Sequence, residues 1–556
     1  MDVRERPDAP ILGGSGASAR SEAPRRAKEP GGAGGSLEDR AAGALERAVE
    51  NLLRRQAPEG CWCAELEGDS ILESEYILTK WIIGEEADPR LPGIASYLRR
   101  LQREDGAWGQ YPGGEVGGGK LDLSATVKGY FALKLMGDDP HAPHMARARD
   151  LILAHGGAAM ANTFSKFYLA ALGQIRYDAV PIIPPQIIYL PRWSYFHMTK
   201  VSAWTRTMIA PLSIVSMHRP VRRLPPGLGI DELYPDERTR HSLTRTGHSR
   251  SPFWTNLFLL ADWNLKLLDR FRLLPLREQA LERMTDWLLQ RSRGSDGPGA
   301  IFPPLVYLLI ALVACRRFPP NHPVVRDTVR HLDNYMIHGL DGTPRNRAED
   351  ASDETIRLQP CESVVWDTGI AAYALANAGL DARHPAMRRC ADWLVSKECR
   401  EPADWVANVK GPVEPSGWYF EYRNPWYPDV DDTVMVAMAL RRIGTPDGIA
   451  ASERSARWVL AMQNEDGGWS AFDRTRDRPL LEYVPFADHN AMQDPSCADI
   501  TGRALESLGQ LGFGAGHPAV QGALEYRKRT ATPGEGCWYG RWGVNYIYGT
   551  YQVLVG

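Results

Sequence analysis

The sequence predicts an all-α protein, and two observations support that prediction. Apolar residues recur with helical spacing through most of the 556 residues, whereas the alternating patterns typical of strands are scarce. A repeated unit also joins an amphipathic helix to a short polar turn that contains Gly and Trp. Its copies recur at intervals of roughly 50 residues, room for a helix pair each, so we expect helices stacked in layers or closed into rings.

The repeat is clearest where Gln and Trp flank the turn. Its copies are Leu53–Trp62, Tyr97–Trp108 and Trp458–Trp469, with weaker copies at Trp393–Trp418 and Tyr526–Trp538. Gly permits the turn, and Gln and Trp can tie the helix end to the next unit by hydrogen bonding and stacking. We therefore assign Trp62, Trp108 and Trp469 to repeat packing rather than to catalysis.

The chain divides into four segments by composition. Residues 1–36 are rich in Gly, Ala, Pro, Arg and Glu without apolar periodicity, which predicts a disordered leader. Residues 37–338 and 358–556 are expected to be two helical domains, and the polar, acidic residues 339–357 a linker or loop between them. Helices before the linker are predicted at Leu37–Leu53, Ser124–Leu135, Arg147–Leu153, Phe164–Leu172, Trp254–Leu268, Glu278–Leu289 and Leu305–Cys315.

Two Pro-rich stretches, Val180–Pro191 and Arg219–Gly229, are predicted loops. The second mixes apolar residues with arginines, a combination that fits either contact with a membrane surface or a packed surface loop. The longest mostly apolar run, Ile301–Cys315, is too short to span a bilayer.

Overall charge and cysteine usage exclude several classes of function. The formal net charge of −3 and a pI near 6.5 give no electrostatic footprint for nucleic acid. The eight cysteines form no regular disulfide framework and no paired C-x-x-C sites, which favours reduced thiols.

The acidic stretch Tyr427–Thr433 contains three carboxylates, Asp429, Asp431 and Asp432, directly before the apolar run Val434–Leu440. That run predicts a helix, so the acids fall at its N-terminal end, where partial positive charge stabilises carboxylates. Three interpretations are open: a solvated helix cap, a magnesium site, or a general acid. The last arises because crowded carboxyls cannot all ionise, so that one keeps its proton.

Taken together, these features resemble the squalene–hopene cyclase family of triterpene cyclases. The resemblance rests on the acidic motif Asp429-x-Asp431-Asp432-Thr433, the Gln/Trp repeats, and the segments Ser363–Gly369, Gly540–Thr550, Leu190–Trp193, Lys200–Thr207, Asp494-Pro495 and Asp499–Thr501. It covers the chain from about residue 40 to its end. A single acidic motif would be weak evidence, but this ordered set is specific.

The resemblance implies two α/α-barrel (toroid) domains around a large apolar cavity. Residues 358–556 would be the catalytic barrel and residues 37–338 the second one. The implied substrate is squalene, cyclised to hopene or hopanol without metal or cofactor, by a peripheral, monotopic homodimer at the cytoplasmic face of the membrane. The family normally continues well past Tyr548-Gly549-Thr550, so the catalytic barrel is expected to be incomplete here.

The resemblance also implies roles for individual residues. Asp431 would be the proton donor, and Asp429 and Asp432 would hold and polarise it. Aromatic faces stabilise cations without reacting with them, and matching positions are Trp204, Trp366, Phe420, Phe472, Trp542 and Tyr548. In some members a His sharpens the acid; the corresponding position here is interpreted as Tyr483, with His489 as a second candidate.

Other interpretations remain open from the sequence. One is a cyclase of the same architecture that takes a shorter isoprenoid or a meroterpenoid, although no second acidic motif of the DDxxD kind is present. Another is a non-catalytic lipid-binding or scaffold protein. The intact acidic motif argues against the second, because crowded buried acids are costly to keep for packing alone.

Overall fold

The computed structural model describes residues 36–109, 121–243, 251–339, 355–489, 491–543 and 545–556. Contacts divide the chain into a unit of residues Met1–Glu50 and a unit of residues Asn51–Gly556. The amphipathic helix α1 (Leu37–Arg54) starts in the first unit and crosses the boundary. The predicted leader lies outside the described residues except for Ser36.

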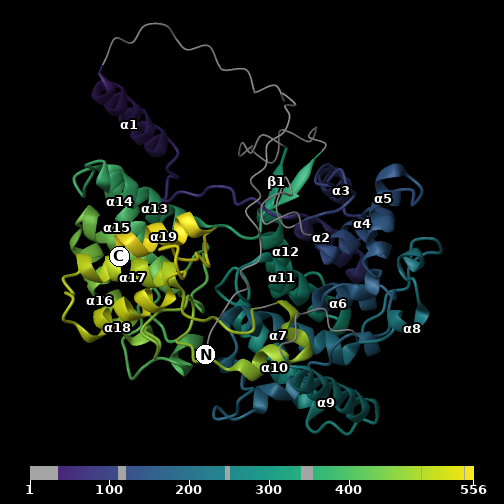
Figure 1. The fold of residues 1–556 in the computed structure, drawn as a ribbon. Helices are drawn as coiled ribbons and strands as arrows, with labels where there is room; N and C mark the ends of the chain where they lie inside the picture. Colours follow the sequence, from purple (N-terminus) through teal and green to yellow (C-terminus); the bar gives the residue numbers. More distant parts are fainter. Residues whose placement is uncertain (1–35, 110–120, 244–250, 340–354, 490, 544) are drawn as a thin grey trace. The chain divides into compact units, whose positions relative to one another are not determined.

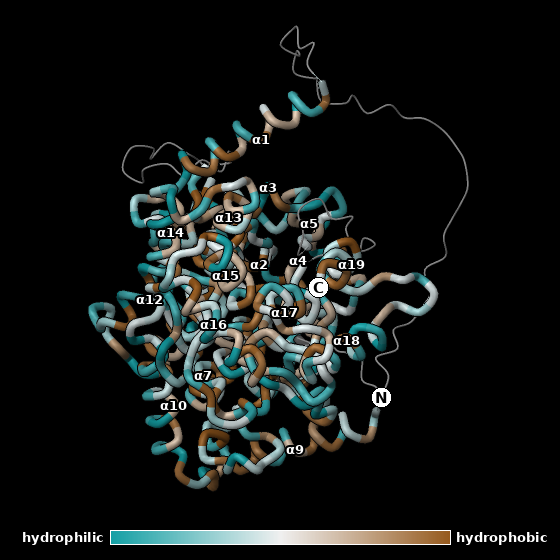
Figure 2. Tube along the Cα trace, turned by 90° about the vertical axis from the view of Figure 1, so that its left-hand side faces the viewer, coloured by the Kyte–Doolittle hydropathy of each residue, from teal (hydrophilic) through white to brown (hydrophobic). Residues whose placement is uncertain are grey.

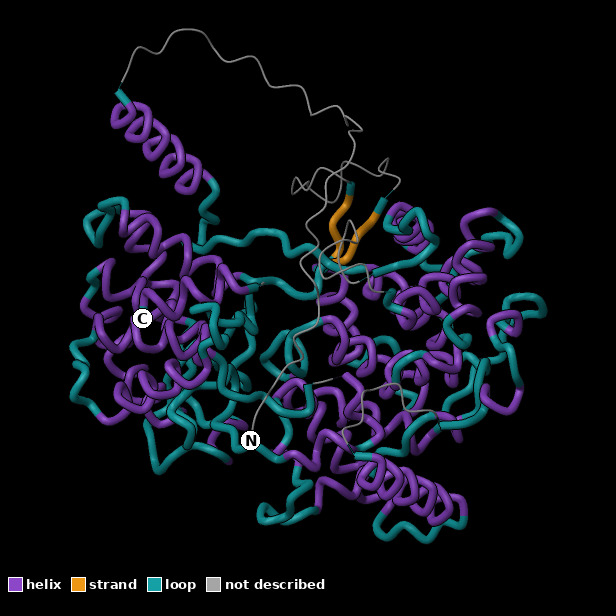
Figure 3. Tube along the Cα trace, viewed as in Figure 1, coloured by secondary structure: helices purple, strands orange, loops and turns teal. Residues whose placement is uncertain are grey.

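The all-α class is confirmed (Figures 1 and 3). Up to residue 338 the α-helices after α1 are α2 (Ser70–Ile83), α3 (Leu91–Arg100), α4 (Leu123–Leu135), α5 (Pro143–Ala154), α6 (Thr163–Ala171), α7 (Ala203–His218), α8 (Glu237–Arg240), α9 (Pro252–Arg270), α10 (Arg277–Ser292), α11 (Phe302–Leu309) and α12 (Pro323–Asn334). The later ones are α13 (Val364–Asn377), α14 (Pro385–Ser396), α15 (Val430–Ile443), α16 (Pro446–Met462), α17 (Ala498–Gln510), α18 (Pro518–Thr530) and α19 (Tyr546–Val555). Each helix predicted before the linker has a counterpart here.

Short elements complete the described chain. The helix predicted at Leu305–Cys315 is α-helical only to Leu309 and continues as a π-helix from Ile310 to Cys315. Strands β1 (Met336–His338) and β2 (Ile356–Leu358) pair antiparallel, with Ile337 opposite Arg357. They flank the predicted linker, most of which lies outside the described residues.

The repeat has one hydrogen-bond geometry throughout the chain. Each repeat Gln donates from Nε2 to the carbonyl of the turn Gly and to a carbonyl of a later helix, as Gln463 does to Gly467 and Ala519. Each repeat Trp donates from Nε1 to a carbonyl of the preceding helix and from its backbone N–H to a Thr hydroxyl of a neighbouring helix. These Trp–Thr pairs are Trp62–Thr368, Trp108–Thr126, Trp418–Thr433, Trp469–Thr501 and Trp538–Thr550. The weaker sequence copies therefore belong to the same repeat.

Apolar side chains of the described residues pack into clusters within the unit of residues Asn51–Gly556. One cluster is built from α2 to α12 and also takes in Leu481, Phe486 and Met492 from a late loop. Another is built from residues 405–523. The loop at 481–492 therefore fastens the later part of the chain to the earlier helices. The boundaries proposed for two domains stay a prediction.

The loop Arg219–Gly229 packs on the protein. Leu224 and Leu228 contact the first apolar cluster, and the N–H of Arg222 donates to the carbonyl of Ala171 at 2.8 Å. Val221 alone among its large apolar side chains is strongly exposed. The interpretation as a packed surface loop therefore fits the structure better than the membrane contact.

Candidate active site

The acidic motif forms the N-terminal turn of α15. Asp429 is the N-cap residue, and its carboxylate accepts the backbone N–H of Asp432 at 2.8 Å. Thr433 is the threonine that the repeat Trp418 holds, and its hydroxyl in turn donates to the carbonyl of Asp429. The repeat therefore fixes the backbone that carries the acids.

The same position of successive repeats supplies the side chains around this turn. Two residues before four of the five Trp-bound threonines stand Trp366 on α13, Asp431 on α15, Asp499 on α17 and Tyr548 on α19. Successive helices of this set pack on one another, so their N-terminal turns lie together. Gly502 permits the last contact, because a Cβ there would lie 2.4 Å from the backbone oxygen of Gln552 on α19.

Arg503, one turn after Asp499 on α17, lies at the centre of this group. Its Nη1 is 3.2 Å from Asp431 Oδ1, and its Cζ lies 4.8 Å from the ring centroid of Trp366 and 6.0 Å from that of Tyr548. Its Nη2 donates to the Tyr548 hydroxyl at 2.9 Å. The guanidinium is thus held beside Asp431 by two of the predicted cation-stabilising aromatic residues.

The three acids differ in their surroundings. Burial raises the pKa of Asp429 to about 7, and burial and the neighbouring Asp429 carboxylate hold the pKa of Asp432 well above its usual range. Like charges this close together in a buried site disfavour ionisation of both carboxyls at once. Burial also raises the pKa of Asp431, while Arg503 lowers it and Asp499 raises it further.

This arrangement separates the acids into a pair and a single group. Asp429 and Asp432 face each other at the helix cap, whereas Asp431 faces Arg503 with 14% of its side chain exposed. The three carboxylates do not converge as magnesium ligands would, and no such cluster of metal-ligating side chains occurs among the described residues. The arrangement fits acid chemistry at Asp431.

The remaining aromatic candidates form two ring contacts. Phe420 stacks on Trp366, with centroids 6.1 Å apart and planes at 29°. Phe472 meets Trp542 edge to face at 5.9 Å. The backbone N–H groups of Phe472 and Trp542 donate to Asp494 and Asp499, respectively.

Trp204 lies apart from these pairs, on α7, where it is 37% exposed. Its part in lining a cavity stays a prediction, as does the large apolar cavity itself.

The roles predicted for Tyr483 and His489 in tuning the acid stay predictions. Tyr483 ends the short 3₁₀ helix Pro479–Tyr483, and the side chain of His489 lies outside the described part of the chain. The charged groups that act on Asp431 are Arg503 and Asp499. Sequence reasoning used Asp499–Thr501 as a motif and missed Arg503, although i,i+4 spacing from Asp499 places Arg503 on the same helix face.

Two family models match this chain. Residues 45–340 match the model of the squalene-hopene cyclase N-terminal domain, and residues 362–556 match that of the C-terminal domain.

Three curated relatives each align with 92% of this chain. They are the squalene–hopene cyclases of Bradyrhizobium diazoefficiens (38% identical, 75% of that protein covered) and Alicyclobacillus acidocaldarius (35%, 77% covered), and the dammaradiene synthase of Dryopteris crassirhizoma (33%, 73% covered). The chain therefore belongs to the squalene–hopene cyclase family and is a class II triterpene cyclase.

Proposed function

We propose that this enzyme converts squalene to a pentacyclic hopanoid, hopene or hopanol, in a reaction that Asp431 starts by protonating a terminal alkene. The proposal rests chiefly on the Asp431–Arg503 pair. This pair lies at the N-terminal turns of α13, α15, α17 and α19, beside the stacked rings of Trp366 and Phe420. Squalene is named for two of the relatives above, which supports it as the substrate.

Two opposed effects equip Asp431 for this step. Burial raises its pKa, so the carboxyl holds a proton at a pH where an exposed Asp would have lost it. Arg503 stabilises the carboxylate that remains after the proton leaves, which makes the group a stronger acid at the moment of transfer. Alkene protonation needs both a bound proton and a stabilised conjugate base.

The steps that follow this proton transfer need no further proton from Asp431. The alkene π electrons form the new C–H bond, and a tertiary carbocation arises at the neighbouring carbon. Later alkenes attack it in turn, and the last cation loses a proton or takes up water, which gives hopene or hopanol, respectively. The Asp431 carboxylate then regains a proton from solvent.

Aromatic rings would stabilise the intermediate cations without quenching them. Phe420, Phe472 and Trp542 are the candidates in the later part of the chain, and Trp204 is the candidate in the earlier part. Trp366 and Tyr548 already contact the Arg503 cation, so their first role is to position it.

The surface of α9 supports the proposed peripheral membrane binding. Its solvent-exposed apolar side chains, continued past the helix end, are Phe253, Leu257, Leu260, Trp263, Leu267, Leu268, Phe271, Leu273 and Leu276. Figure 2 shows the apolar residues along this helix. Such an amphipathic face suits the interfacial layer of a bilayer. No helix in the described part of the chain has the length and apolarity to cross one. The homodimer stays a prediction.

Detergent-solubilised protein incubated with squalene, followed by gas chromatography and mass spectrometry of the extract, tests the proposed reaction. A pentacyclic hydrocarbon or alcohol is expected from the wild-type chain, and neither from Asp431→Asn. If squalene is returned unchanged while a shorter isoprenoid is cyclised, the substrate assignment is wrong but the acid assignment stands.

A further inference from the structure

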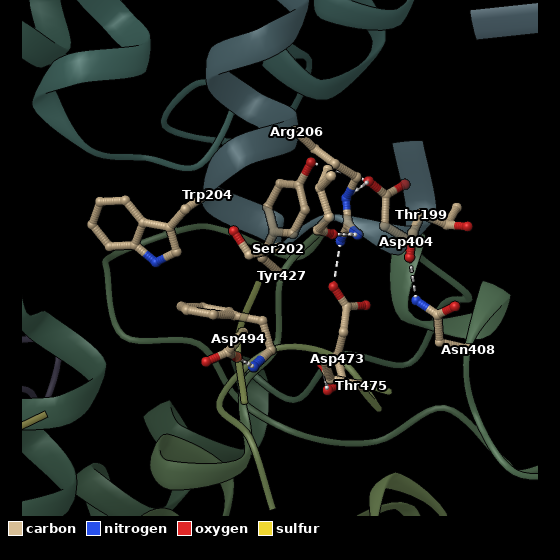
Figure 4. Close-up of polar contacts among 12 residues, drawn as sticks. Thr199, Ser202, Trp204, Arg206, Asp404, Asn408, Tyr427, Asp473, Thr475 and Asp494 are labelled. Atoms are coloured by element: carbon tan, nitrogen blue, oxygen red, sulfur yellow. Dashed lines mark hydrogen bonds and ion pairs between the residues drawn. The ribbon is translucent and has the colours of Figure 1, made fainter. Parts of the chain in front are cut away.

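A polar pocket of about 190 Å³ lies next to the N-terminus of α7. The segments Thr199–Ser202 and Asp473–Arg476 line it, together with Ala407, Asn408, Glu465, Arg478 and Asp494. Figure 4 shows several of these side chains around Arg206. The proposed cyclisation gives such a polar pocket no role, because its substrate and intermediates are hydrocarbon.

The buried floor of this pocket is neutralised internally. Asp473 pairs with Arg206 at 2.6 Å, and Arg206 also lies 3.6 Å from Asp404. Asp494 accepts the backbone N–H of Phe472 and lies 3.8 Å from Arg541. Each of these carboxylates therefore has a cation beside it.

The cations at the wall and rim of the pocket have fewer carboxylate partners than those at its floor. Within the part of the chain that the structure describes, neither Lys200 nor Arg478 has an ion pair with a carboxylate. Glu465 serves both Arg474 at 3.6 Å and Arg476 at 4.0 Å, and it is itself 61% exposed. Among the described residues, Glu465 is thus the one carboxylate that forms an ion pair with any of these four cations. Lys200 lies just before the N-terminal end of α7, which adds partial positive charge.

Repulsion among these cations is visible at Lys200. Burial, Arg478 and the exposed Arg192 lower the pKa of its amine. Cations held together without counter-charges raise the free energy of the fold unless an anion joins them. A phosphate group would relieve this repulsion, and arginine guanidinium groups match its geometry.

A series of ring contacts connects the pocket with α9. The Arg478 guanidinium lies over the Tyr195 ring at 5.4 Å, Tyr195 contacts Phe196 at 5.3 Å, and Phe196 contacts Phe258 of α9 at 5.9 Å. Trp193, next to Arg192, is 85% exposed. An anion bound at Lys200 and Arg478 would therefore lie beside the surface that we expect to enter the bilayer.

We propose that this pocket binds the phosphate of an anionic phospholipid headgroup, held by Lys200, Arg474, Arg476 and Arg478. The inference rests on the peripheral membrane binding proposed above. Binding of the headgroup would fix the orientation of the enzyme on the bilayer, because the apolar face of α9 can insert into the bilayer but recognises no particular lipid. A zwitterionic choline headgroup suits the site less well, because its ammonium would meet the same cations.

Binding of the full chain to vesicles tests the proposal. Vesicles of phosphatidylcholine alone report on the apolar face, and vesicles with one-fifth phosphatidylglycerol report on the pocket. We expect phosphatidylglycerol to strengthen binding by about tenfold or more, since a basic residue near the surface contributes on the order of fivefold. No binding to either vesicle would contradict the peripheral location, whereas binding without this gain would contradict the pocket alone.

Charge-conserving variants separate a built site from general attraction. Arg478→Lys keeps the charge and loses the planar fork, so the gain from phosphatidylglycerol should fall at least threefold. The matched control Arg270→Lys, on exposed α9 outside the pocket, should leave the gain unchanged. Glu465→Gln, which frees Arg474 and Arg476, should increase the gain. Equal behaviour of Arg478→Lys and Arg270→Lys would overturn the proposal.

Competition identifies the source of the phosphate. Inorganic phosphate at constant ionic strength should reduce the gain only at concentrations far above those of the lipid phosphate, because the bilayer holds the headgroup beside the pocket. Complete loss of the gain at equal concentrations would assign the pocket to a free phosphate instead. Squalene turnover in detergent should be unchanged in Arg478→Lys, which keeps this test separate from that of the reaction.

Discussion

Two carboxylate–cation pairs in this protein are similar in composition, but we assign them different roles. Glu75 on α2 and Lys128 on α4 lie 2.6 Å apart, with 5% and 2% of their side chains exposed, and the Tyr168 hydroxyl donates to the second oxygen of Glu75 at 3.1 Å. Asp431 and Arg503 lie 3.2 Å apart with 14% and 6% exposed, and Arg503 Nη1 makes no hydrogen bond with a described residue.

The two pairs differ in whether their polar atoms have hydrogen-bond partners. Each oxygen of the Glu75 carboxylate has a hydrogen-bond donor, Lys128 on one and Tyr168 on the other, so this pair contributes to a defined core. The Asp431 pair is close enough for electrostatic stabilisation yet lacks an aligned hydrogen bond, so its proton remains available. A buried ion pair is therefore no evidence of a site by itself, whereas an incomplete one beside aromatic faces is.

The largest expected effect is on activity, and it distinguishes the Asp431–Arg503 pair from the Glu75–Lys128 pair. Asp431→Asn removes the transferable proton and keeps the shape, so turnover of squalene should fall by at least ~10²–10⁴-fold, the usual contribution of a general acid. Product quantified by gas chromatography measures this, and the thermal midpoint should stay near that of the wild type. A variant that still cyclises would remove Asp431 from the proposed role.

The second effect separates the pairs by stability. Lys128→Met leaves Glu75 buried without its cation, which should lower the free energy of unfolding by about 3–5 kcal/mol. Thermal unfolding followed by circular dichroism measures the loss. Glu75→Gln in the same chain should restore most of it, because the amide keeps the bond to Tyr168 without a charge. If Lys128→Met reduced activity per folded molecule and left stability intact, the comparison would be wrong.

The third effect concerns pH. Arg503 lowers the pKa of Asp431, and the proposed reaction requires protonated Asp431, so we expect activity to fall as pH rises through that pKa. Arg503→Gln removes this lowering, and the alkaline limb of the profile should therefore move to higher pH while the maximal rate falls roughly 10–100-fold because the acid is weaker. A limb that moves to lower pH, or does not move, would contradict the assignment of Arg503.

Local sequence information was enough to predict the helices, the repeats and the position of the acids at a helix start. Helical periodicity and the turn after each Gln depend only on residues that are neighbours in the sequence. Trp418 and Trp538 bond to Thr as the other repeat tryptophans do, which explains why the weaker copies were still recognisable. The resemblance to a family then supplied roles for Asp431 and the aromatic residues.

What the sequence did not reveal depends on contacts between distant segments. Arg503 reaches Asp431 only because α17 packs on α15, and the pairing of Asp429 with Asp432 depends on the cap geometry. Likewise, the apolar stripe of α9 has the periodicity of a buried helix, and only the packed structure reveals that it faces outward. The loop Arg219–Gly229 was considered for membrane contact in its place.

The smallest expected effect tests whether Tyr548 positions Arg503. Tyr548→Phe removes the hydroxyl that accepts from Arg503 Nη2 at 2.9 Å but keeps the ring, so the guanidinium stays near and loses one restraint. We expect a rate loss of only a few-fold, about the value of one hydrogen bond to a charged group, and a smaller shift of the alkaline limb in the same direction as in Arg503→Gln. In an Arg503→Gln background the change should add little, because both act through one cation. Independent, additive effects would instead indicate that Tyr548 contacts the substrate cation directly.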